Sequence, residues 1–596
     1  MKQHIINIAV FLSILLVAIL VRFIGINWDS GYMLHPDERF LVMVGTAMTI
    51  PQTFISYLTT ATSTMNPENV GYDFFVYGSF PVILNKLLAV WTDNDTYNAF
   101  AYLGRAISAT ADVLTVILVY KIAQLFAWYR GWSKKVPYIA MALYALAVMP
   151  IQLSHYFTVD TFLNMFVVAA TYFCLRYRFT ARWYWLFPAG LCFGLALASK
   201  ISAVYFAPLL GLFMVLGVVN GKSFRIVHKN KNGGKKPQYA ETQEKTNLTI
   251  WKSRGKVLRV LGLITIAGLL FTVVAYLAVR LANPYYFEEP VLWSLSLNEQ
   301  WLASIESLES LNNPDVWFPP AIQWINTTPV WFPLKNMVVL GLGIPFTILV
   351  ILGMYHAVRQ KRRIELIVIL LWLAGFFLYQ SIQFSKNMRY FITLYPFFAL
   401  IAGYGWAQLS AKRWWQHGLI LLAVIIWPLM FMNVYLQPHT RVAASYWIYE
   451  NIPDGSYILS EHWDDPLPLM VPTRQGKSFS GEQLEVFGED TDYKMQTIEE
   501  KLSLADYYIL SSNRAWGSIQ NTPQRYPRMS DFYEDLLAEK KGYEVIYVGT
   551  SYPSLEWLGI PLTLPTDWAD ESFTVYDHPK VIILQNTKQA SPEDMY

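Results

Sequence analysis

Long apolar runs fill the first three quarters of the chain. A helix needs about 20 mainly apolar residues to cross a bilayer, and about eleven runs approach that length. They lie near residues 5–24, 101–121, 136–154, 157–175, 183–199, 202–220, 258–280, 336–357, 364–381, 390–408 and 417–436. The pattern predicts a polytopic α-helical membrane domain over residues 1–436, with about eleven transmembrane helices.

The pattern changes after residue 436 to short β-rich runs separated by polar residues. Four runs, 457–460, 507–510, 543–548 and 580–584, are typical of strands, and 529–541 is typical of a helix between two of them. Residues 437–596 therefore predict a separate α/β domain of about 150 residues.

Basic residues predict the sidedness of the membrane domain. Lysine and arginine clusters follow every second predicted span, and such clusters gather on the cytoplasmic side of membrane proteins. With a cytoplasmic N-terminus, the basic segment 221–259 is a cytoplasmic connector. The loops 25–100 and 281–335 and the C-terminal α/β domain then lie outside. We expect a multi-pass cell-membrane protein with membrane lipid as a partner.

The composition supports a polytopic membrane protein and excludes a disulfide-rich fold. The 596 residues are 54% hydrophobic and only 15% charged, with a formal net charge of +3. The near-neutral charge gives no indication of a nucleic-acid partner. Only two cysteines are present, both in apolar runs, so no disulfide framework is available.

The two expected outer loops differ in character. Residues 82–91 are apolar but too short to span a bilayer, which predicts a helix lying along the interface. The loop 281–335 is rich in tryptophan. Tryptophan is enriched at membrane interfaces, but the same residues could also form a lid that closes over a bound lipid or sugar.

An acidic pair, Asp37 and Glu38, follows the first span. Pro36 fixes its own φ and favours a turn or the first turn of a helix, where free backbone amides stabilise ionised carboxylates. The pair is therefore a candidate for base chemistry. The alternative is that it solvates a loop or caps a helix that begins near Phe40.

Further charged or titratable residues lie in spans or at the expected outer rim. Such groups are costly in a membrane and often mark function. The candidates for substrate binding are Arg105, His155, Asp160, Lys200, Lys386 and Arg389. Each could alternatively snorkel to the interface, and Arg105 could pair with Asp112 on nearly the same helical face.

Acids and cations on one surface suit transfer of a group from a membrane-embedded phosphate ester. The cations would neutralise charge on the departing phosphate, and a carboxylate would accept the proton of an attacking hydroxyl. Histidine and carboxylates could instead hold a divalent cation, although their spacing defines no metal site.

Several of these motifs together resemble the GT-C membrane glycosyltransferases, in particular the branch of protein O-mannosyltransferases and lipid A aminoarabinose transferases. The motifs are the pair Asp37 and Glu38, the stretch from His155 to Asp160, Gly194 to Lys200, and Arg389-Tyr390 followed by Leu394-Tyr395-Pro396. The resemblance covers roughly residues 1–436.

The resemblance implies an inverting glycosyltransferase with a polyprenyl-phosphate-linked sugar donor. It implies Asp37 as the base with Glu38 assisting, Arg105, Lys200 and Arg389 facing the donor phosphate, and Asp160 supporting the site or a metal. The loop 281–335 is too short for the β-trefoil-like insert of eukaryotic O-mannosyltransferases, which leaves the acceptor open as protein, lipid or glycan. The alternative function is a transporter or flippase of lipid-linked sugars.

Overall fold

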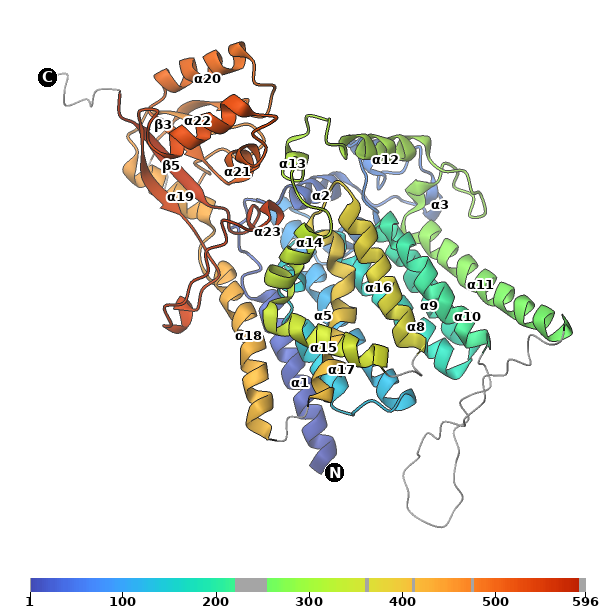
Figure 1. Cartoon of the computed structure of the whole chain (residues 1–596). Coiled ribbons are helices and arrows are strands. Elements are labelled where there is room, and N and C mark those ends of the chain that lie inside the picture. Colours follow the sequence, from blue (N-terminus) through green and yellow to red (C-terminus); the bar gives the residue numbers. More distant parts are fainter. Residues whose placement is uncertain (1, 220–253, 360–363, 410–412, 473–475, 589–596) are drawn as a thin grey trace.

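A computed structural model describes residues 2–219, 254–359, 364–409, 413–472 and 476–588. It contains a large helical bundle with a smaller sheet domain at one end (Figure 1). The predicted connector 221–259 lies mostly outside the described residues.

Helices occupy all the predicted apolar runs. The bundle helices are α1 (Lys2–Phe23), α5 (Tyr97–Tyr129), α6 (Val136–Ala145), α7 (Val148–Ser154), α8 (Asp160–Thr180), α9 (Leu186–Ser199), α10 (Ala207–Val219), α11 (Arg254–Ala282), α15 (Ile344–Arg359), α16 (Ile364–Ile382), α17 (Tyr395–Gln408) and α18 (Trp414–Leu436). Within the described residues, seven helices are long and apolar enough to cross a membrane, or up to nine when each bent pair counts as one span. The count of about eleven is therefore not confirmed.

Two predicted spans are bent, and one is short. The helices α6 and α7 meet at a bend of 56°. The helical segment Trp331–Leu342 meets α15 at a bend of 112°. The region around α9 falls among the shorter apolar helices. The criterion of apolar length predicted ordinary spans for these segments, because a run of hydrophobic residues does not reveal a bend.

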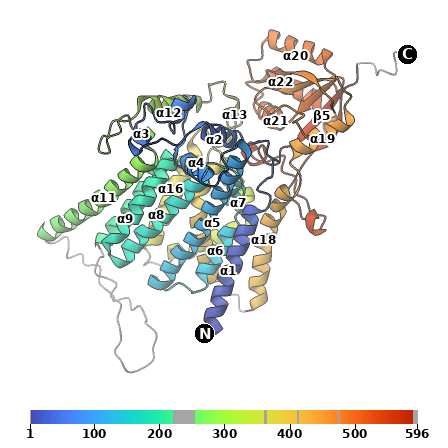
Figure 2. The ribbon, with the colours of Figure 1, turned by 180° about the vertical axis from the view of Figure 1, so that it is seen from behind.

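Shorter elements cover one end of the bundle (Figures 1 and 2). These elements are α2 (Pro36–Ala47), α3 (Phe54–Leu58), α4 (Phe80–Trp91), α12 (Glu299–Leu311), α13 (Pro319–Ile322) and α14 (Trp331–Asn336). The short apolar helix expected at 82–91 is thus present as α4. We call this end of the bundle, which also carries the sheet domain, the α2 end.

The C-terminal domain is the predicted α/β unit. Its strands are β1 (Tyr457–Glu461), β2 (Ser480–Leu484), β3 (Tyr507–Leu510), β4 (Tyr543–Gly549) and β5 (Val581–Asn586). The sheet has the order β2-β1-β3-β5-β4, with β1 parallel to β2 and β3, and β5 antiparallel to β3 and β4. Sequence analysis missed β2, whose first three residues are exposed and which therefore lacks an apolar run.

Four helices cover the sheet of this domain. The helices are α19 (Thr440–Asn451), α20 (Asp492–Leu504), α21 (Arg514–Gln520) and α22 (Pro527–Leu537). Ile498 of α20 and Phe532 of α22 belong to one apolar cluster with Leu459, whereas Ile448 of α19 belongs to another with Ile458. Neighbouring residues of a strand point to opposite faces, so helices pack on both sides of the sheet.

The contact between α15 and α17 depends on small residues. A Cβ atom added at Gly405 would lie 2.4 Å from the backbone oxygen of Leu349 and 2.6 Å from the backbone nitrogen of Gly353. Glycine at this position therefore lets the two helix backbones approach closely, as small residues do in membrane bundles.

We expect Gly405→Ala to lower the thermal unfolding midpoint of the purified protein, because the added methyl group meets backbone atoms that cannot rotate away. Overpacking of this kind costs about 1–3 kcal/mol. The matched control is Gly375→Ala on α16, where nothing lies within 4 Å of the new methyl group. Equal midpoints for the two variants would contradict this account of the contact.

Candidate active site at the α2 end

The start of α2 is built to hold its acidic pair. His35 is the N-cap residue, and its Nδ1 accepts a hydrogen bond from the backbone nitrogen of Glu38 at 3.3 Å. Pro36 occupies the first turn, where its missing N–H is not needed. Asp37 and Glu38 follow in that turn, where the helix dipole favours negative charge. The predicted first-turn position is thus present.

The two acids point to different partners. Glu38 is fully buried, and its Oε1 and Oε2 accept hydrogen bonds from Arg105 at 2.7 and 2.8 Å. Asp37 instead forms an ion pair with Arg389 of the 3-10 helix Met388–Leu394. Because consecutive residues of a helix lie about 100° apart, one short helix presents the acids to two different clusters.

Arg105 belongs to a closed cluster. Its guanidinium also donates to Asp29 at 3.0 and 2.7 Å and to the backbone oxygen of Ile26 at 2.9 Å. Arg105, Asp29 and Glu38 are all fully buried. The alternative pairing of Arg105 with Asp112 is wrong, because the fully buried Asp112 pairs with Arg22 at 2.6 Å.

A second ion pair lies close to that of Asp37. Lys200 Nζ lies 2.8 Å from Asp160 Oδ1. The same ammonium lies 5.0 Å from the centre of the Tyr390 ring, and the Arg389 guanidinium lies 5.6 Å from it. Tyr390 therefore joins the two ion pairs into one cluster, which we call the paired-charge cluster.

Burial and charge act in opposite directions on the acids. Burial raises the pKa of Asp37, but the neighbouring Arg389 and His35 and hydrogen bonds from Arg389 and Tyr77 lower it, and the net pKa is well below its usual range. Burial raises the pKa of Glu38 more than Arg105 lowers it. In this arrangement Asp37 is ionised and weakly basic.

Two predicted residues, His155 and Lys386, lie outside both the paired-charge cluster and the Arg105 cluster. The His155 ring is fully buried and bonds through Nδ1 and Nε2 to the backbone oxygens of Ile151 and Ile24 at 2.8 and 2.9 Å. Lys386 Nζ donates to the backbone oxygen of Phe384 at 3.0 Å. The structure thus brings together Asp37, Asp160, Lys200 and Arg389, whereas Glu38 and Arg105 form their own cluster.

Sequence analysis missed three residues that shape the site. The ring of Tyr576, from the C-terminal domain, lies 4.1 Å from that of His35. Tyr77 hydrogen-bonds Asp37, and Asp29 completes the Arg105 cluster. None of these three residues stands beside a predicted site residue in the sequence.

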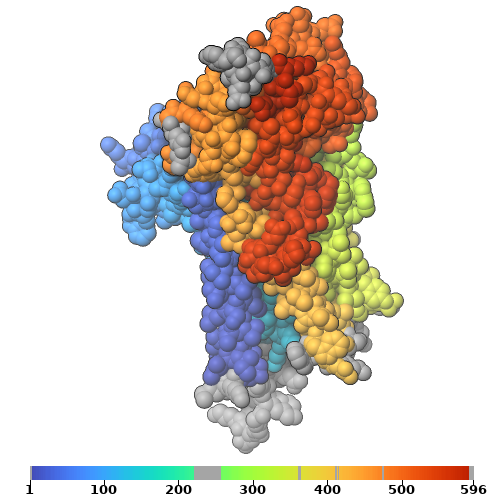
Figure 3. Space-filling view, turned by 90° about the vertical axis from the view of Figure 1, so that its left-hand side faces the viewer, coloured from blue at the N-terminus to red at the C-terminus, as the bar shows by residue number. Residues whose placement is uncertain are grey.

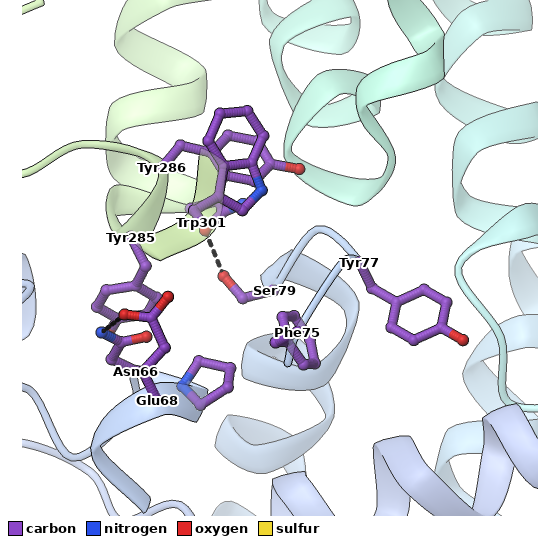
Figure 4. Close-up of a pocket in the computed structure, with 10 residues that line it drawn as sticks. Asn66, Glu68, Phe75, Tyr77, Ser79, Tyr285, Tyr286 and Trp301 are labelled. Atoms are coloured by element: carbon purple, nitrogen blue, oxygen red, sulfur yellow. Dashed lines mark hydrogen bonds between the residues drawn. The ribbon is translucent and has the colours of Figure 1, made fainter. Parts of the chain in front are cut away.

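Tyr77 separates Asp37 from a small open hollow between the loops 25–100 and 281–335. Figure 4 shows the Tyr77 side chain pointing away from the other labelled residues. In the hollow, the rings of Tyr286 and Trp301 lie 4.3 Å apart, and Ser79 donates to Asn283 at 2.6 Å. The lining residues are Asn66, Pro67, Glu68, Phe75, Tyr77, Ser79, Asn283, Tyr285, Tyr286 and Trp301.

A metal site does not emerge from these side chains. No group of three or more His, Cys, Asp or Glu residues is placed to hold a metal ion within the described ranges. The carboxylates of Asp37 and Asp160 each pair with a cation instead. The donor set therefore does not fit the divalent cation that the sequence left open.

Two parts of the chain match known families. Residues 101–229 match the family of dolichyl-phosphate-mannose-protein mannosyltransferases, and residues 327–461 match the Alg9-like mannosyltransferase family. The resemblance to GT-C membrane glycosyltransferases is thereby confirmed. At the level of reaction class, the chain is a glycosyltransferase.

Solved membrane enzymes are similar to this glycosyltransferase over most of its length. One is the archaeal oligosaccharyltransferase AglB from Archaeoglobus fulgidus in complex with an inhibitory peptide and a dolichol-phosphate, with a TM-score of 0.49, 13% identity and coverage of 99% of this chain and 89% of that chain. Another is ArnT from Cupriavidus metallidurans bound to undecaprenyl phosphate, with a TM-score of 0.45, 13% identity and coverage of 98% and 99%. No curated protein matches the chain.

His35 gives this glycosyltransferase a measurable pH dependence of stability. Burial lowers the pKa of His35 from 6.5 to about 4, more than neighbouring charges such as Asp37 raise it. Between these values the unfolded chain binds a proton that the folded protein does not, so the free energy of unfolding falls as the pH falls through this window. The full shift corresponds to about 3 kcal/mol.

We therefore expect His35→Asn to lose less thermal stability than the unsubstituted protein between pH 7 and pH 5. Asparagine keeps an N-cap acceptor but does not titrate. Unfolding midpoints of the two purified proteins at both pH values provide the measurement, and the other titrating groups are common to both. An equal decline in the two proteins would show that His35 is not the source.

Proposed function

We propose that the chain transfers a sugar from a polyprenyl-phosphate carrier to an acceptor hydroxyl at the α2 end, with inversion, on the outer face of the cell membrane. The observation that carries the proposal is the paired-charge cluster. The Asp37 carboxylate lies in contact with the partly buried Arg389 guanidinium, beside a lysine ammonium. The family model of dolichyl-phosphate-mannose-protein mannosyltransferases supports this class of donor.

Arg389 is the main candidate ligand of the donor phosphate. Its Nε is buried and has no hydrogen-bond partner among the described residues. Arginine presents several N–H groups in a planar fork that matches phosphate oxygens. Lys200 adds a second cation, 5.0 Å from the centre of the Tyr390 ring. A phosphate bound to Arg389 and Lys200 would replace the carboxylates with which these two cations pair.

In the proposed reaction, the oxygen of the acceptor hydroxyl attacks the anomeric carbon of the sugar, and Asp37 accepts the proton of that hydroxyl. The bond between that carbon and the phosphate oxygen breaks, and the electron pair leaves with the carrier phosphate. Arg389 and Lys200 stabilise the charge that grows on this phosphate. Glu38, with both oxygens bound by Arg105, holds α2 in place and does not face the acceptor.

Phosphate binding also supplies the basicity that Asp37 lacks without donor. Arg389 lowers the pKa of Asp37 because it is paired with the carboxylate. When Arg389 turns to the donor phosphate, Asp37 loses a counter-ion and its pKa rises. The base is therefore prepared for proton transfer only when a donor is present.

The alternative of a transporter for lipid-linked sugars is not favoured by the family matches. The placement of the charges also supports the enzyme, because Asp37, Asp160 and Lys200 all lie at helix ends and not in the middle of spans. A transporter would need such groups near the bilayer midplane.

We expect Asp37→Asn to reduce sugar transfer by about 100-fold or more, because loss of a general base typically costs that much. Mass spectrometry of the sugar-phosphate lipid consumed by purified protein in membrane lipid extract measures the rate. The matched control is Asp95→Asn, since Asp95 lies in the same loop but pairs with Lys86. Retained activity in the Asp37 variant would remove the proposed base.

We expect Arg389→Ala to raise the apparent KM for the donor more than that for the acceptor, because the lost guanidinium binds only the donor phosphate. Arg389→Lys keeps the charge and should recover part of the donor affinity. Arg528→Ala serves as a control, since its exposed pair with Asp492 contributes little. Equal effects on both substrates would contradict the phosphate role of Arg389.

A further inference from the structure

The C-terminal domain carries a compact apolar loop, residues 552–566. Its two sides are joined by a bridge between Ser554 and Thr563 and by a hydrogen bond from the Leu555 nitrogen to the Leu562 oxygen at 2.9 Å. Gly559 forms the turn with φ of +76°, a conformation that favours glycine. The loop therefore has a defined shape.

This apolar loop does not lie on the sheet of its own domain. It extends along the side of α18 in both ribbon views, and Figure 3 shows it covering part of that helix. The Ser554 nitrogen donates to the backbone oxygen of Met430 at 2.9 Å, and Trp557 Nε1 donates to that of Leu429 at 3.1 Å. These two hydrogen bonds fix the loop of the C-terminal domain to α18.

The point of contact lies within a membrane-spanning helix. Leu429 precedes the last residue of α18, Leu436, by seven positions, which at 1.5 Å per residue is about 10 Å along the helix. Apolar segments that lie in a membrane interface enter by about 5–10 Å. Taking the end of α18 as the membrane surface places the apolar loop at the depth where headgroups give way to acyl chains.

The exposed side chains of the loop are apolar, as that depth requires. Trp557, Leu558, Ile560 and Leu562 are between 38% and 48% exposed although they are large and apolar. Exposed apolar residues elsewhere in the C-terminal domain, such as Met470 and Tyr493, are scattered along the chain. Contiguous exposed apolar groups mark an interaction surface.

The neighbouring surface indicates what covers these side chains. α18 itself exposes Leu419, Leu421, Leu422 and Leu436, as a helix that faces lipid does. The exposed face of the apolar loop continues this surface. Glu556, the only charged residue from 552 to 566, accepts a hydrogen bond from Thr563 at 2.8 Å, which suits a position near the headgroups.

We propose that residues 552–566 insert into the lipid bilayer beside α18 and anchor the C-terminal domain to the membrane surface. The partner is the lipid itself, through its acyl chains. From this anchor the chain reaches Tyr576, which contacts His35, so the anchor also holds one wall of the candidate site. This inference does not depend on the proposed sugar transfer.

The test uses the full protein in vesicles of phosphatidylcholine and phosphatidylglycerol. Leu558→Cys is labelled with an environment-sensitive thiol dye, and quenching by nitroxide lipids is compared with quenching by aqueous iodide. Tyr493→Cys on α20, 80% exposed in the same domain, is the matched control. The unsubstituted protein, whose cysteines are buried or half-buried, gives the background.

We expect nitroxide lipids to quench the dye at position 558 several-fold more than at position 493, and iodide to show the reverse order. A dye at 558 that iodide quenches as strongly as at 493 would overturn the proposal. So would a dye that neither agent reaches, since the loop would then be covered by protein. Ile560→Cys replaces Leu558→Cys if that variant does not fold, because Ile560 lies in the same loop and is equally exposed.

Discussion

The buried guanidinium of Arg105 is the interaction on which the candidate site depends. It joins the span α5 to the segment that follows α1 by binding Asp29, Glu38 and the backbone of Ile26. A buried charge without partners is very costly, and removal of one partner from such a cluster typically costs 3–5 kcal/mol. The cluster therefore fixes the position of α2 relative to the bundle. Once Glu38 is held on one side of α2, the adjacent Asp37 must face another direction, where Arg389 lies.

The same rule of paired charges organises the rest of the α2 end. Asp112 pairs with Arg22 and Asp160 with Lys200, each bringing together segments that are distant in the sequence. These pairs differ in access to solvent. The Arg22 pair is fully buried, whereas the Lys200 side chain is 21% exposed. Closed clusters hold the helices, and the partly open paired-charge cluster is the one in which we propose that a substrate anion replaces a carboxylate.

Sequence patterns predicted much of this arrangement because they report on local physics. Apolar runs predicted the helices, short β-rich runs predicted four of the five strands, and Pro36 indicated the helix start that carries Asp37. Pairing is a property of the three-dimensional fold, so the sequence could not assign Arg105 to Glu38 over Asp112. It also could not separate the buried His155 from the residues near Asp37. The exposed strand β2 and the bent spans lacked any periodic signal.

The strength of the Asp37 and Arg389 pair is compatible with sugar transfer only if the pair opens during the reaction. A carboxylate held by a guanidinium is a poor base, and a guanidinium held by a carboxylate is a poor phosphate ligand. Exchange of the Asp37 carboxylate for a phosphate at Arg389 would free the carboxylate to act as a base and the guanidinium to bind phosphate. In the proposed reaction, a donor phosphate bound to Arg389 would satisfy its free Nε and leave Asp37 facing the acceptor with less positive charge beside it. Without donor, the ion pair neutralises both groups. On the proposed mechanism, the base and the phosphate site would therefore be prepared by the same event, the binding of donor.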